Sequence, residues 1–261
     1  MIYPCSDPSA WGPSLDAAVH AVQRGEVVVL PTDTVYGVAA DAFAPDGVTA
    51  VLAAKGRGRQ MPPPVLIPDI RTVDGLAREV PPYARALMER FWPGPLTVIV
   101  LAQPSLAWDL GDTHGTVALR VPDHPAARAL LSRTGPLAVT SANRTGHPAA
   151  TTAADAQEQL GAAVAVYLDG GPSPLGEAST IVDATNPAGL RIVRDGGVSL
   201  ADIVEVVGED ALLKPDSAEA DADTHADSGA DSTPASDGSD APYGPDGPDA
   251  PAADRGEEPR P

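Results

Sequence analysis

Lys55 and Arg57 are the residues of this sequence whose types and spacing best suit the binding of a phosphate chain. Only two of the 17 Lys and Arg residues are lysines, at positions 55 and 214. In Lys55-Gly56-Arg57 an ammonium and a planar guanidinium can contact one anion, and the glycine lets the backbone approach it. A solvated basic turn explains the same spacing equally well. For Arg59 a solvated side chain is the simpler expectation.

A second candidate is the polar segment Pro31-Thr32-Asp33-Thr34-Val35-Tyr36-Gly37, which directly follows an apolar run. The end of a buried strand is a common ligand position in α/β sheets. The hydroxyls of Thr32, Thr34 and Tyr36 could therefore bind a small polar ligand. Alternatively, Asp33 caps a turn and Tyr36 is a core aromatic.

Two further segments have the same context. Thr140-Ser141-Ala142-Asn143 follows the apolar run 137–139, and by itself it is interpreted as a turn. Arg120 ends the apolar run 117–119. A guanidinium at a strand end needs a carboxylate or a phosphate, from the protein or from a ligand, because an unpaired buried charge is costly.

Several other chemistries are excluded by missing motifs. The sequence has no Gly-x-x-x-x-Gly-Lys-Ser/Thr loop and no Gly-x-Gly-x-x-Gly after a strand. It also has no His-Glu-x-x-His motif and no Gly-x-Ser-x-Gly elbow. The lone cysteine, Cys5, excludes an internal disulfide and a cysteine-based zinc cluster, which fits a reducing compartment. We expect five structural or exposed histidines, no protein-held metal and no acyl-enzyme chemistry.

The elements that would position these residues alternate along the chain. Apolar runs predict strands at 27–30, 65–67, 96–102, 116–119, 137–139, 164–168, 180–182 and 190–193. Ala- and Leu-rich stretches predict helices at 14–24, 46–54, 82–91, 124–133, 152–160 and from Ser199 onward. This alternation predicts an α/β domain with one twisted mixed sheet and packed helices, and it places Lys55 in a loop between helix and strand.

Charge divides the chain into two parts, residues 1–208 and residues 209–261. The second part holds 15 of the 36 Asp and Glu but 3 of the 17 Lys and Arg, so 12 of the 19 net negative charges lie there. From about Pro215 the composition is Ala, Asp, Ser, Pro and Gly, which predicts a disordered acidic tail. We interpret it as a solubilising appendage in preference to a docking arm or a nucleic-acid mimic.

No apolar run approaches the roughly 18 residues that a membrane-spanning helix needs. The N-terminus has neither a basic nor an apolar region, so no secretory signal is expected. The sequence predicts a cytoplasmic protein without a membrane partner.

Five segments occur in a fixed order: LPTDTVYGVAADA (30–42), KGRGRQMPPPVLI (55–67), FWPGPLTVIV (91–100), VALRVPDHP (117–125) and LAVTSANRTGHP (137–148). EASTIVDA (177–184) and LRIVRDGG (190–197) follow them. Together these segments, spread over about residues 14–205, resemble the YrdC/TsaC family of L-threonylcarbamoyl-AMP synthases. The resemblance implies a single YrdC-like α/β domain around a concave, positively lined cavity. It also implies that L-threonine, bicarbonate or CO2 and ATP are joined into L-threonylcarbamoyl-AMP with release of pyrophosphate, the first step of tRNA threonylcarbamoyladenosine modification.

The resemblance also implies residue roles. Those for ATP or AMP are Lys55, Arg57, Thr116, Ser141, Asn143 and Arg194, with Lys55 and Arg57 as the catalytic pair on the triphosphate. Those for threonine are Thr34, Arg120, Thr140, Ser179 and Thr180, with Arg120 forking onto the carboxylate. Magnesium is expected to arrive with ATP. Possible partners are tRNA and downstream threonylcarbamoyl-transfer proteins.

One departure from the family pattern affects these roles. Family members carry Pro-x-x-x-Pro-Leu and then a histidine after Lys-x-Arg, whereas residues 58–68 here contain no histidine. A threonine contact from that histidine is therefore lost or replaced.

Two alternative functions remain. One is an RNA-binding module that uses the same cavity, although the net charge of −7 left for residues 1–208 argues against an extensive phosphate footprint. The other is a superfamily relative with a different carbamoyl-adenylate substrate. Such relatives carry acylphosphatase and zinc-finger-like regions, and nothing in this sequence resembles those.

Overall fold

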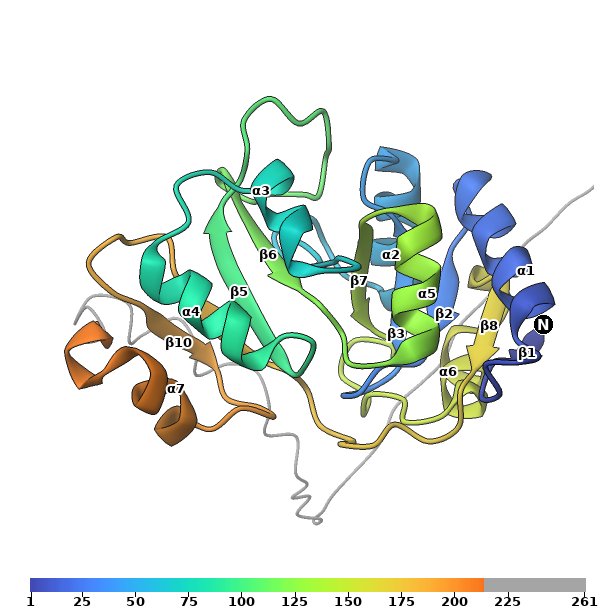
Figure 1. The fold of residues 1–261 in the computed structure, drawn as a ribbon. Helices are drawn as coiled ribbons and strands as arrows, with labels where there is room; N and C mark the ends of the chain where they lie inside the picture. Colours follow the sequence, from blue (N-terminus) through green and yellow to red (C-terminus); the bar gives the residue numbers. More distant parts are fainter. Residues whose placement is uncertain (214–261) are drawn as a thin grey trace, which may run out of the picture. The chain divides into compact units, whose positions relative to one another are not determined.

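Ten strands join into one sheet within residues 1–213, the part of the chain that this computed structural model describes (Figure 1). Across the sheet they are β1 (Ile2–Pro4), β8 (Val166–Asp169), β2 (Val28–Leu30), β3 (Gly37–Asp41), β7 (Leu137–Ser141), β4 (Val65–Leu66), β6 (Thr116–Arg120), β5 (Leu96–Leu101), β9 (Thr180–Asp183) and β10 (Arg191–Arg194). β8 pairs in parallel with β1 and β2, whereas β3 pairs antiparallel with β2 and β7. The predicted mixed α/β sheet is confirmed.

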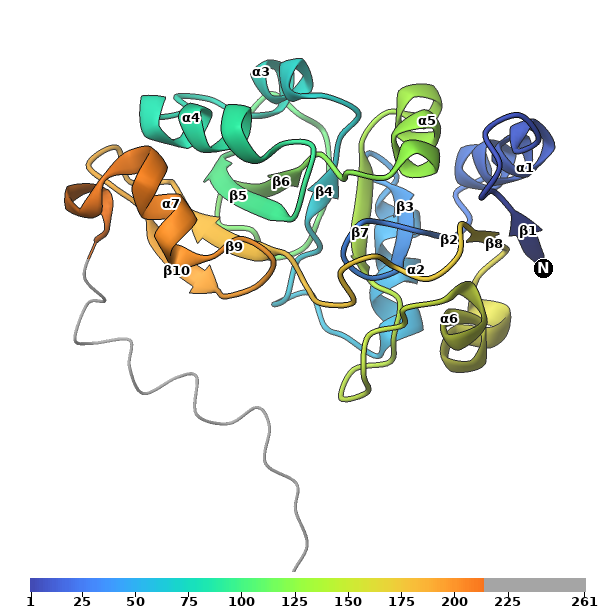
Figure 2. The same cartoon turned by 60° about the horizontal axis from the view of Figure 1, so that its bottom comes forward.

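Helices cover both faces of one half of the sheet. In the same residues 1–213 they are α1 (Gly12–Gln23), α2 (Pro45–Lys55), α3 (Val73–Leu76), α4 (Pro82–Phe91), α5 (Pro125–Thr134), α6 (Ala153–Leu160) and α7 (Leu200–Val207). Figure 2 shows α1 and α5 on one side of β2, β3 and β7, with α2 and α6 on the other. Val28 and Leu30 pack in the cluster that contains α1 and α5, whereas Val29 packs with α2 and α6. β2 is apolar throughout because both of its faces are buried.

The other half of the sheet has one helical face and one open face. In β5, Leu96, Val98 and Val100 belong to the core cluster that includes α4. Thr97 and Ile99 point to the opposite face, since successive side chains alternate in a strand, and both line a pocket there. The pocket therefore lies where no helix covers the sheet.

The elements that the sequence did not predict are β1, β3 and α3. β3 is the important one, because its residues Gly37-Val38-Ala39-Ala40 are small and entirely buried between β2 and β7 and show no polar alternation. Its pairing extends β7 to Ser141, which lies opposite Gly37. Thr140 and Ser141 therefore belong to a strand and not to a turn.

The expected loop position of Lys55 is also corrected. α2 ends at Lys55, and Gly56 follows in the left-handed conformation with φ of 66°. Glycine adopts this conformation without steric cost, so it is suited to end a helix. The ammonium therefore starts from the last helical turn.

Residues 209–213 remain in contact with the preceding fold. The Leu190 amide donates to the Ala211 carbonyl at 2.8 Å, and the Leu213 amide donates to the Leu190 carbonyl at 2.9 Å. The disorder predicted from about Pro215 falls on residues 214–261, which lie outside the described residues. That disorder and the division of the chain into 1–208 and a tail 209–261 stay predictions. No helix within residues 1–213 is both long enough and apolar enough to cross a membrane.

Candidate active site

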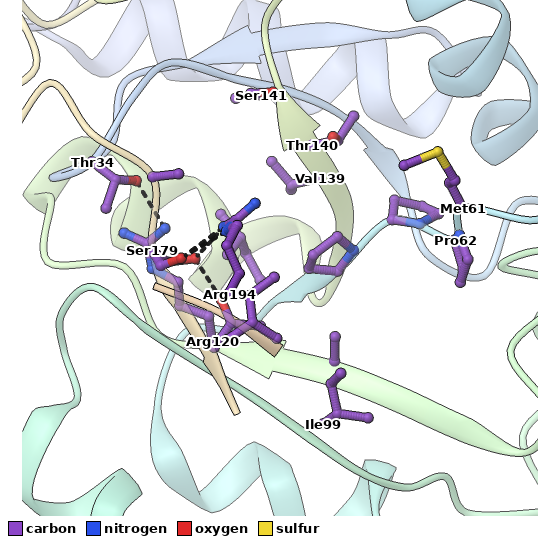
Figure 3. A pocket seen from close by; sticks show the side chains of 18 of the residues that line it. Thr34, Met61, Pro62, Ile99, Arg120, Val139, Thr140, Ser141, Ser179 and Arg194 are labelled. Atoms are coloured by element: carbon purple, nitrogen blue, oxygen red, sulfur yellow. Dashed lines mark hydrogen bonds between the residues drawn. The ribbon is translucent and has the colours of Figure 1, made fainter. Parts of the chain in front are cut away.

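A pocket of about 400 Å³ lies on the open face of the sheet (Figure 3). Of the residues proposed from the sequence, those that line it are Thr34, Arg57, Thr116, Arg120, Thr140, Ser141, Ser179 and Arg194. They come from three strands, β6, β7 and β10, and from three loops, before β3, after α2 and before β9, which are far apart in the sequence. The fold therefore brings together most of the predicted site residues.

Arg120 forms the buried centre of one side of the pocket. Its Nη2 atom donates to Asp33 Oδ1 at 2.5 Å, its Nη1 atom to Thr34 Oγ1 at 2.9 Å, and its Nε atom to the Gly94 carbonyl at 2.9 Å. Asp33 Oδ1 also accepts from the backbone amide of Asp123, whereas its Oδ2 atom is buried without a partner. The carboxylate that Arg120 requires is thus supplied by the protein.

The guanidinium of Arg120 keeps capacity for a ligand. An arginine carries five N–H donors, and Nη1 and Nη2 each hold two of them. Each of these two atoms makes one hydrogen bond within the protein. A second, forked contact to a carboxylate remains available in chemical terms.

Arg194 lies over Ser179 at the same end of the pocket. Its Nε and Nη2 atoms donate to the Ser179 carbonyl at 3.1 and 2.7 Å, and Nη2 also lies 3.2 Å from Ser179 Oγ. Ser179 Oγ in turn lies 2.8 Å from Thr97 Oγ1. The pKa of Arg194 is lowered by burial and, to a lesser extent, by the charge of Arg57.

Arg57 is the least satisfied cation in the pocket. Its Nη1 atom donates to Thr140 Oγ1 at 3.3 Å, and its buried Nε atom has no hydrogen-bond partner. Burial lowers its pKa. Within residues 1–213 neither Arg57 nor Arg194 forms an ion pair, in contrast to Arg120. Two partly buried positive charges without a carboxylate favour an anionic ligand.

Lys55 does not line the pocket, contrary to the expected phosphate contact. Its side chain is 2% exposed and ends beneath the turn that follows β7. The ammonium lies 2.6 Å from the Ser141 carbonyl, 2.9 Å from both the carbonyl and Oδ1 of Asn143, and 3.3 Å from Ser141 Oγ. Burial, and secondarily the charge of Arg57, lowers the pKa of Lys55 to about 8. The ammonium holds the turn that presents Ser141.

Asn143 and Thr180 are also outside the lining. Asn143 Oδ1 accepts from Ser141 Oγ at 2.6 Å, and its amide donates to the His147 carbonyl, so this side chain braces the turn. Thr180 Oγ1 donates to the Val198 carbonyl at 2.7 Å and accepts from the Val198 amide at 2.9 Å. Thr180, the first residue of β9, faces the core, whereas the preceding Ser179 lines the pocket. The expected threonine contact of Thr180 stays a prediction that this placement does not support.

The other candidates of the 31–37 segment complete the site, and Thr32 and Tyr36 also line the pocket. Thr32 Oγ1 lies 2.9 Å from Thr34 Oγ1 and donates to the Val35 carbonyl at 2.6 Å. Tyr36 is a core aromatic whose hydroxyl donates to the Gly171 carbonyl at 2.5 Å. Asp33, expected to cap a turn, is the ion-pair partner of Arg120. The motif PTDT carried the signal for Asp33, but only the fold pairs it with β6.

The two ends of the pocket differ in polarity. Thr34, Arg120, Ser179 and Arg194 lie together at one end in Figure 3, and Met61 lies at the other. The apolar part of the wall comprises Met61, Pro62, Pro63, Ile99, Leu110 and Val193. This arrangement suits a ligand with both charged groups and an apolar ring.

The lining residues do not fit a resident magnesium ion. Mg²⁺ prefers oxygen ligands and is usually held by one or two carboxylates together with substrate phosphates. The pocket wall contains no Asp or Glu, and residues 1–213 contain no group of three His, Cys, Asp or Glu that could hold a metal. We therefore assign no step of the chemistry to a protein-bound metal.

Sequence comparisons place the chain among proteins of one family. Residues 20–196 match the Sua5/YciO/YrdC family profile, which is described as "Telomere recombination". A putative threonylcarbamoyl-AMP synthase of Mycobacterium tuberculosis is 52% identical over 209 residues, which cover 80% of this chain and 96% of that protein. The threonylcarbamoyl-AMP synthase of Bacillus subtilis is 39% identical over 199 residues, which cover 75% of this chain and 57% of that protein.

Solved structures give the same result. Sua5 of Pyrococcus abyssi complexed with L-threonine superposes with a TM-score of 0.76 at 31% identity, covering 82% of this chain and 62% of that one. This chain thus spans less than two thirds of the archaeal protein. Escherichia coli YciO, at 23% identity and a TM-score of 0.69, shares the fold. Since both the family profile and a 52% identical relative match most of the chain, it belongs to the Sua5/YciO/YrdC family.

Proposed function

We propose that this protein is an L-threonylcarbamoyl-AMP synthase that joins L-threonine, bicarbonate or CO2 and ATP and releases pyrophosphate. The observation that carries the proposal is the pair of half-buried arginines, Arg57 and Arg194, which face the pocket without a carboxylate partner in the described residues. The names of the relatives support the same activity.

ATP binds along the polar part of the wall in this proposal. Arg57 and Arg194 neutralise the phosphates, and the Ser141 hydroxyl and Thr116 contact the nucleotide. Lys55 and Asn143 do not contact the nucleotide and contribute indirectly, since they hold the turn that carries Ser141. Such preorganised positive charge is worth most where phosphate charge is redistributed in the transition state.

Threonine binds at the end formed by Thr34, Arg120 and Ser179. The second N–H on Nη1 and on Nη2 of Arg120 form a fork for the carboxylate, while Asp33 keeps the guanidinium in place. Thr140 lies between this end and the phosphate end, because its hydroxyl accepts from Arg57. The L-threonine bound to the archaeal Sua5 supports this ligand.

The chemistry proceeds in two steps. The neutral threonine amine attacks the carbon of CO2, which is bicarbonate that has lost hydroxide, and a new N–C bond gives the carbamate after loss of one proton. A carbamate oxygen then attacks the α-phosphorus of ATP. The new O–P bond replaces the bond from the α-phosphorus to the β-bridging oxygen, which leaves with its electron pair as pyrophosphate. Arg57 and Arg194 stabilise the charge that develops on the leaving group.

Mg²⁺ enters as a complex with the phosphates of ATP. The product is consumed in the modification of tRNA, by transfer proteins that act after this one. A cytoplasmic location, where both ATP and tRNA occur, is the fitting setting.

The test is a product assay with purified protein. ATP, magnesium and bicarbonate are incubated with and without L-threonine, and pyrophosphate release is measured together with the mass of any adenylate. Threonine- and bicarbonate-dependent pyrophosphate and a threonylcarbamoyl-AMP mass are expected. ATP cleavage that ignores threonine contradicts the proposal, and salt-dependent tRNA binding without any adenylate favours an RNA-binding role instead.

A further inference from the structure

Two loops form the apolar end of the pocket. The first, residues 57–64, begins with Arg57 and contributes Met61, Pro62, Pro63 and Pro64 to the apolar wall. The second, residues 102–115, contributes Leu110 and Thr113. Neither loop belongs to the sheet, so the sheet alone does not fix the shape of this end.

Arg59 joins the two loops. Its Nη2 atom donates to Asp109 Oδ1 at 2.6 Å, and its Nε atom lies 3.9 Å from Asp112 Oδ1. The Arg59 carbonyl accepts from the Asp112 amide at 2.9 Å. Among the described residues, every hydrogen bond and ion pair between these two loops passes through Arg59.

The second loop is shaped to receive Arg59. Gly111 has φ of 105°, and a Cβ atom there would lie 2.6 Å from the Arg59 carbonyl oxygen. Only glycine permits both this conformation and this close approach. Asp109 Oδ1 accepts from the Gly111 amide at 3.1 Å as well as from Arg59, so one carboxylate oxygen orders both the turn and the cross-loop contact.

We propose that Arg59 is a positioning residue that joins the 57–64 and 102–115 loops and so shapes the apolar end of the pocket to hold the base of the nucleotide. Arg59 is not part of the pocket wall and acts through Met61 on its own loop and Leu110 on the other. The assignment of the base to this end rests on the proposed function, since the phosphates of ATP require Arg57 and Arg194 and the base is left for the apolar wall beyond them. Tripolyphosphate, which has no base, does not need this end.

The ion pair between Arg59 and Asp109 is expected to contribute only modestly to nucleotide affinity. Arg59 and Asp109 have side chains that are 54% and 46% exposed, and exposed pairs typically change an equilibrium by less than about fivefold. Arg24 and Glu26 provide a matched control far from the pocket, with a 2.6 Å contact and side chains that are 59% and 42% exposed. A general effect of losing an exposed arginine pair would appear in both places.

The experiment measures the affinity of the full-length protein for ATP and for tripolyphosphate by calorimetry. We expect Arg59→Ala to weaken ATP binding by about threefold to fivefold and to leave tripolyphosphate binding unchanged, whereas Arg24→Ala changes neither. Asp109→Asn should reproduce the effect, and the exchange of charges in Arg59→Asp with Asp109→Arg should restore part of the ATP affinity. The fluorescence of Trp108, which stacks on Phe43 at 5.4 Å, reports whether the 102–115 loop has moved.

Two results would overturn the inference. Unchanged ATP affinity in folded Arg59→Ala and Asp109→Asn shows that the bridge is not needed. Equal weakening of ATP and tripolyphosphate shows that Arg59 acts on the phosphates, by its own charge or through Arg57 on the same loop, and not through the base. Failure of the proposed function is separate, because it appears as ATP binding by the wild-type protein without threonine-dependent product.

Discussion

Three cations within one motif have three different environments. Arg57 faces the pocket with an unsatisfied Nε atom, Lys55 is enclosed by oxygens of the turn, and Arg59 bridges two exposed loops. The differences follow from where the helix ends, because Lys55 is the last residue of α2 and Arg57 lies beyond Gly56. The residue types therefore indicated anion binding for the whole motif, but the position of each residue in the fold gives each cation a different role.

Arg57→Ala should lower kcat/KM for ATP by about 10²- to 10³-fold, comparable to the loss of one preorganised charge-stabilising donor. The cause is the loss of the guanidinium that has no protein carboxylate to compensate it. Steady-state kinetics with varied ATP measure the effect. Arg71→Ala is the control, since Arg71 pairs with Asp69 on the surface. Retention of wild-type kinetics in Arg57→Ala would remove Arg57 from the phosphate site.

The buried ammonium predicts a pH dependence of ATP binding. Burial lowers the pKa of Lys55 from its ordinary value of 10.5 to about 8. Above this pKa the neutral amine no longer holds the carbonyls of Ser141 and Asn143 as firmly, so ATP affinity should fall as the pH rises through about 8. Calorimetry on either side of this pH measures the effect, and Lys55→Met should abolish it.

The same group has the opposite effect on stability. Between pH 8 and 10.5 Lys55 is largely protonated in the unfolded chain but largely neutral in the folded chain. The unfolded state therefore binds more protons than the native state in this range. The contribution of Lys55 to the free energy of unfolding therefore rises with pH across this window. This contribution is measured as the difference in the free energy of unfolding between wild type and Lys55→Met at each pH. If the contribution falls with rising pH while ATP affinity is lost, the assignment of the pH effect to Lys55 is contradicted.

At the scale of elements, the start of strand β9 separates a ligand-facing residue, Ser179, from a structural one, Thr180. Ser179 Oγ contacts Thr97 and Arg194 on the pocket side, whereas Thr180 Oγ1 both donates to and accepts from the backbone of Val198 on the core side. The alternation of side chains in a strand decides which of the two adjacent hydroxyls reaches a ligand.

Replacement of Thr180 should affect stability but not threonine binding, whereas replacement of Ser179 should affect threonine binding. Thr180→Val leaves the buried Val198 amide and carbonyl without a partner and should lower the free energy of unfolding by about 1–3 kcal/mol, with threonine affinity unchanged. Ser179→Ala removes a pocket hydroxyl and should weaken threonine binding by about threefold to tenfold. Urea unfolding and calorimetry measure the two effects. Weaker threonine binding in Thr180→Val than in Ser179→Ala would reverse the assignment.

Strand β3 shows why part of the element order escaped prediction. Its small, fully buried residues carry neither polar alternation nor a β-branched run, and its place in the sheet depends on β2 and β7 on either side. Strands with a clear signal, such as β5 and β6, were predicted to within one residue of their observed ends. The helix from Pro82 to Phe91 was predicted with its observed bounds, since Pro81 and Pro82 mark its start.

At the scale of the whole molecule, the acidic C-terminal segment is predicted to be dispensable. Deletion of residues 215–261 should leave the melting temperature and kcat/KM for both substrates essentially unchanged, because that composition cannot support a hydrophobic core. Thermal unfolding and the pyrophosphate assay measure the two quantities. A large loss of either would show that the segment contributes to folding or to the site.

The sequence by itself determined the α/β class, the family, and the set of polar segments from which the site is built. It could do so because strand and helix periodicity are local properties of the sequence. In addition, the segments PTDT, KGR, LR and TSAN occur along the chain in the order that the family resemblance requires. Six residues of these four segments line one pocket: Thr32, Thr34, Arg57, Arg120, Thr140 and Ser141.

Only the tertiary structure decided which of these side chains meets a ligand and which holds another in place. Asp33 pairs with Arg120, the turn after β7 encloses Lys55, and the backbone of Val198 binds Thr180, so the polar groups of Asp33, Lys55 and Thr180 have partners within the protein. Arg57 and Arg194 have no carboxylate partner in the described fold. The reason is physical: burial makes an unpaired charge or hydroxyl costly, and which groups become paired depends on contacts between segments far apart in the sequence.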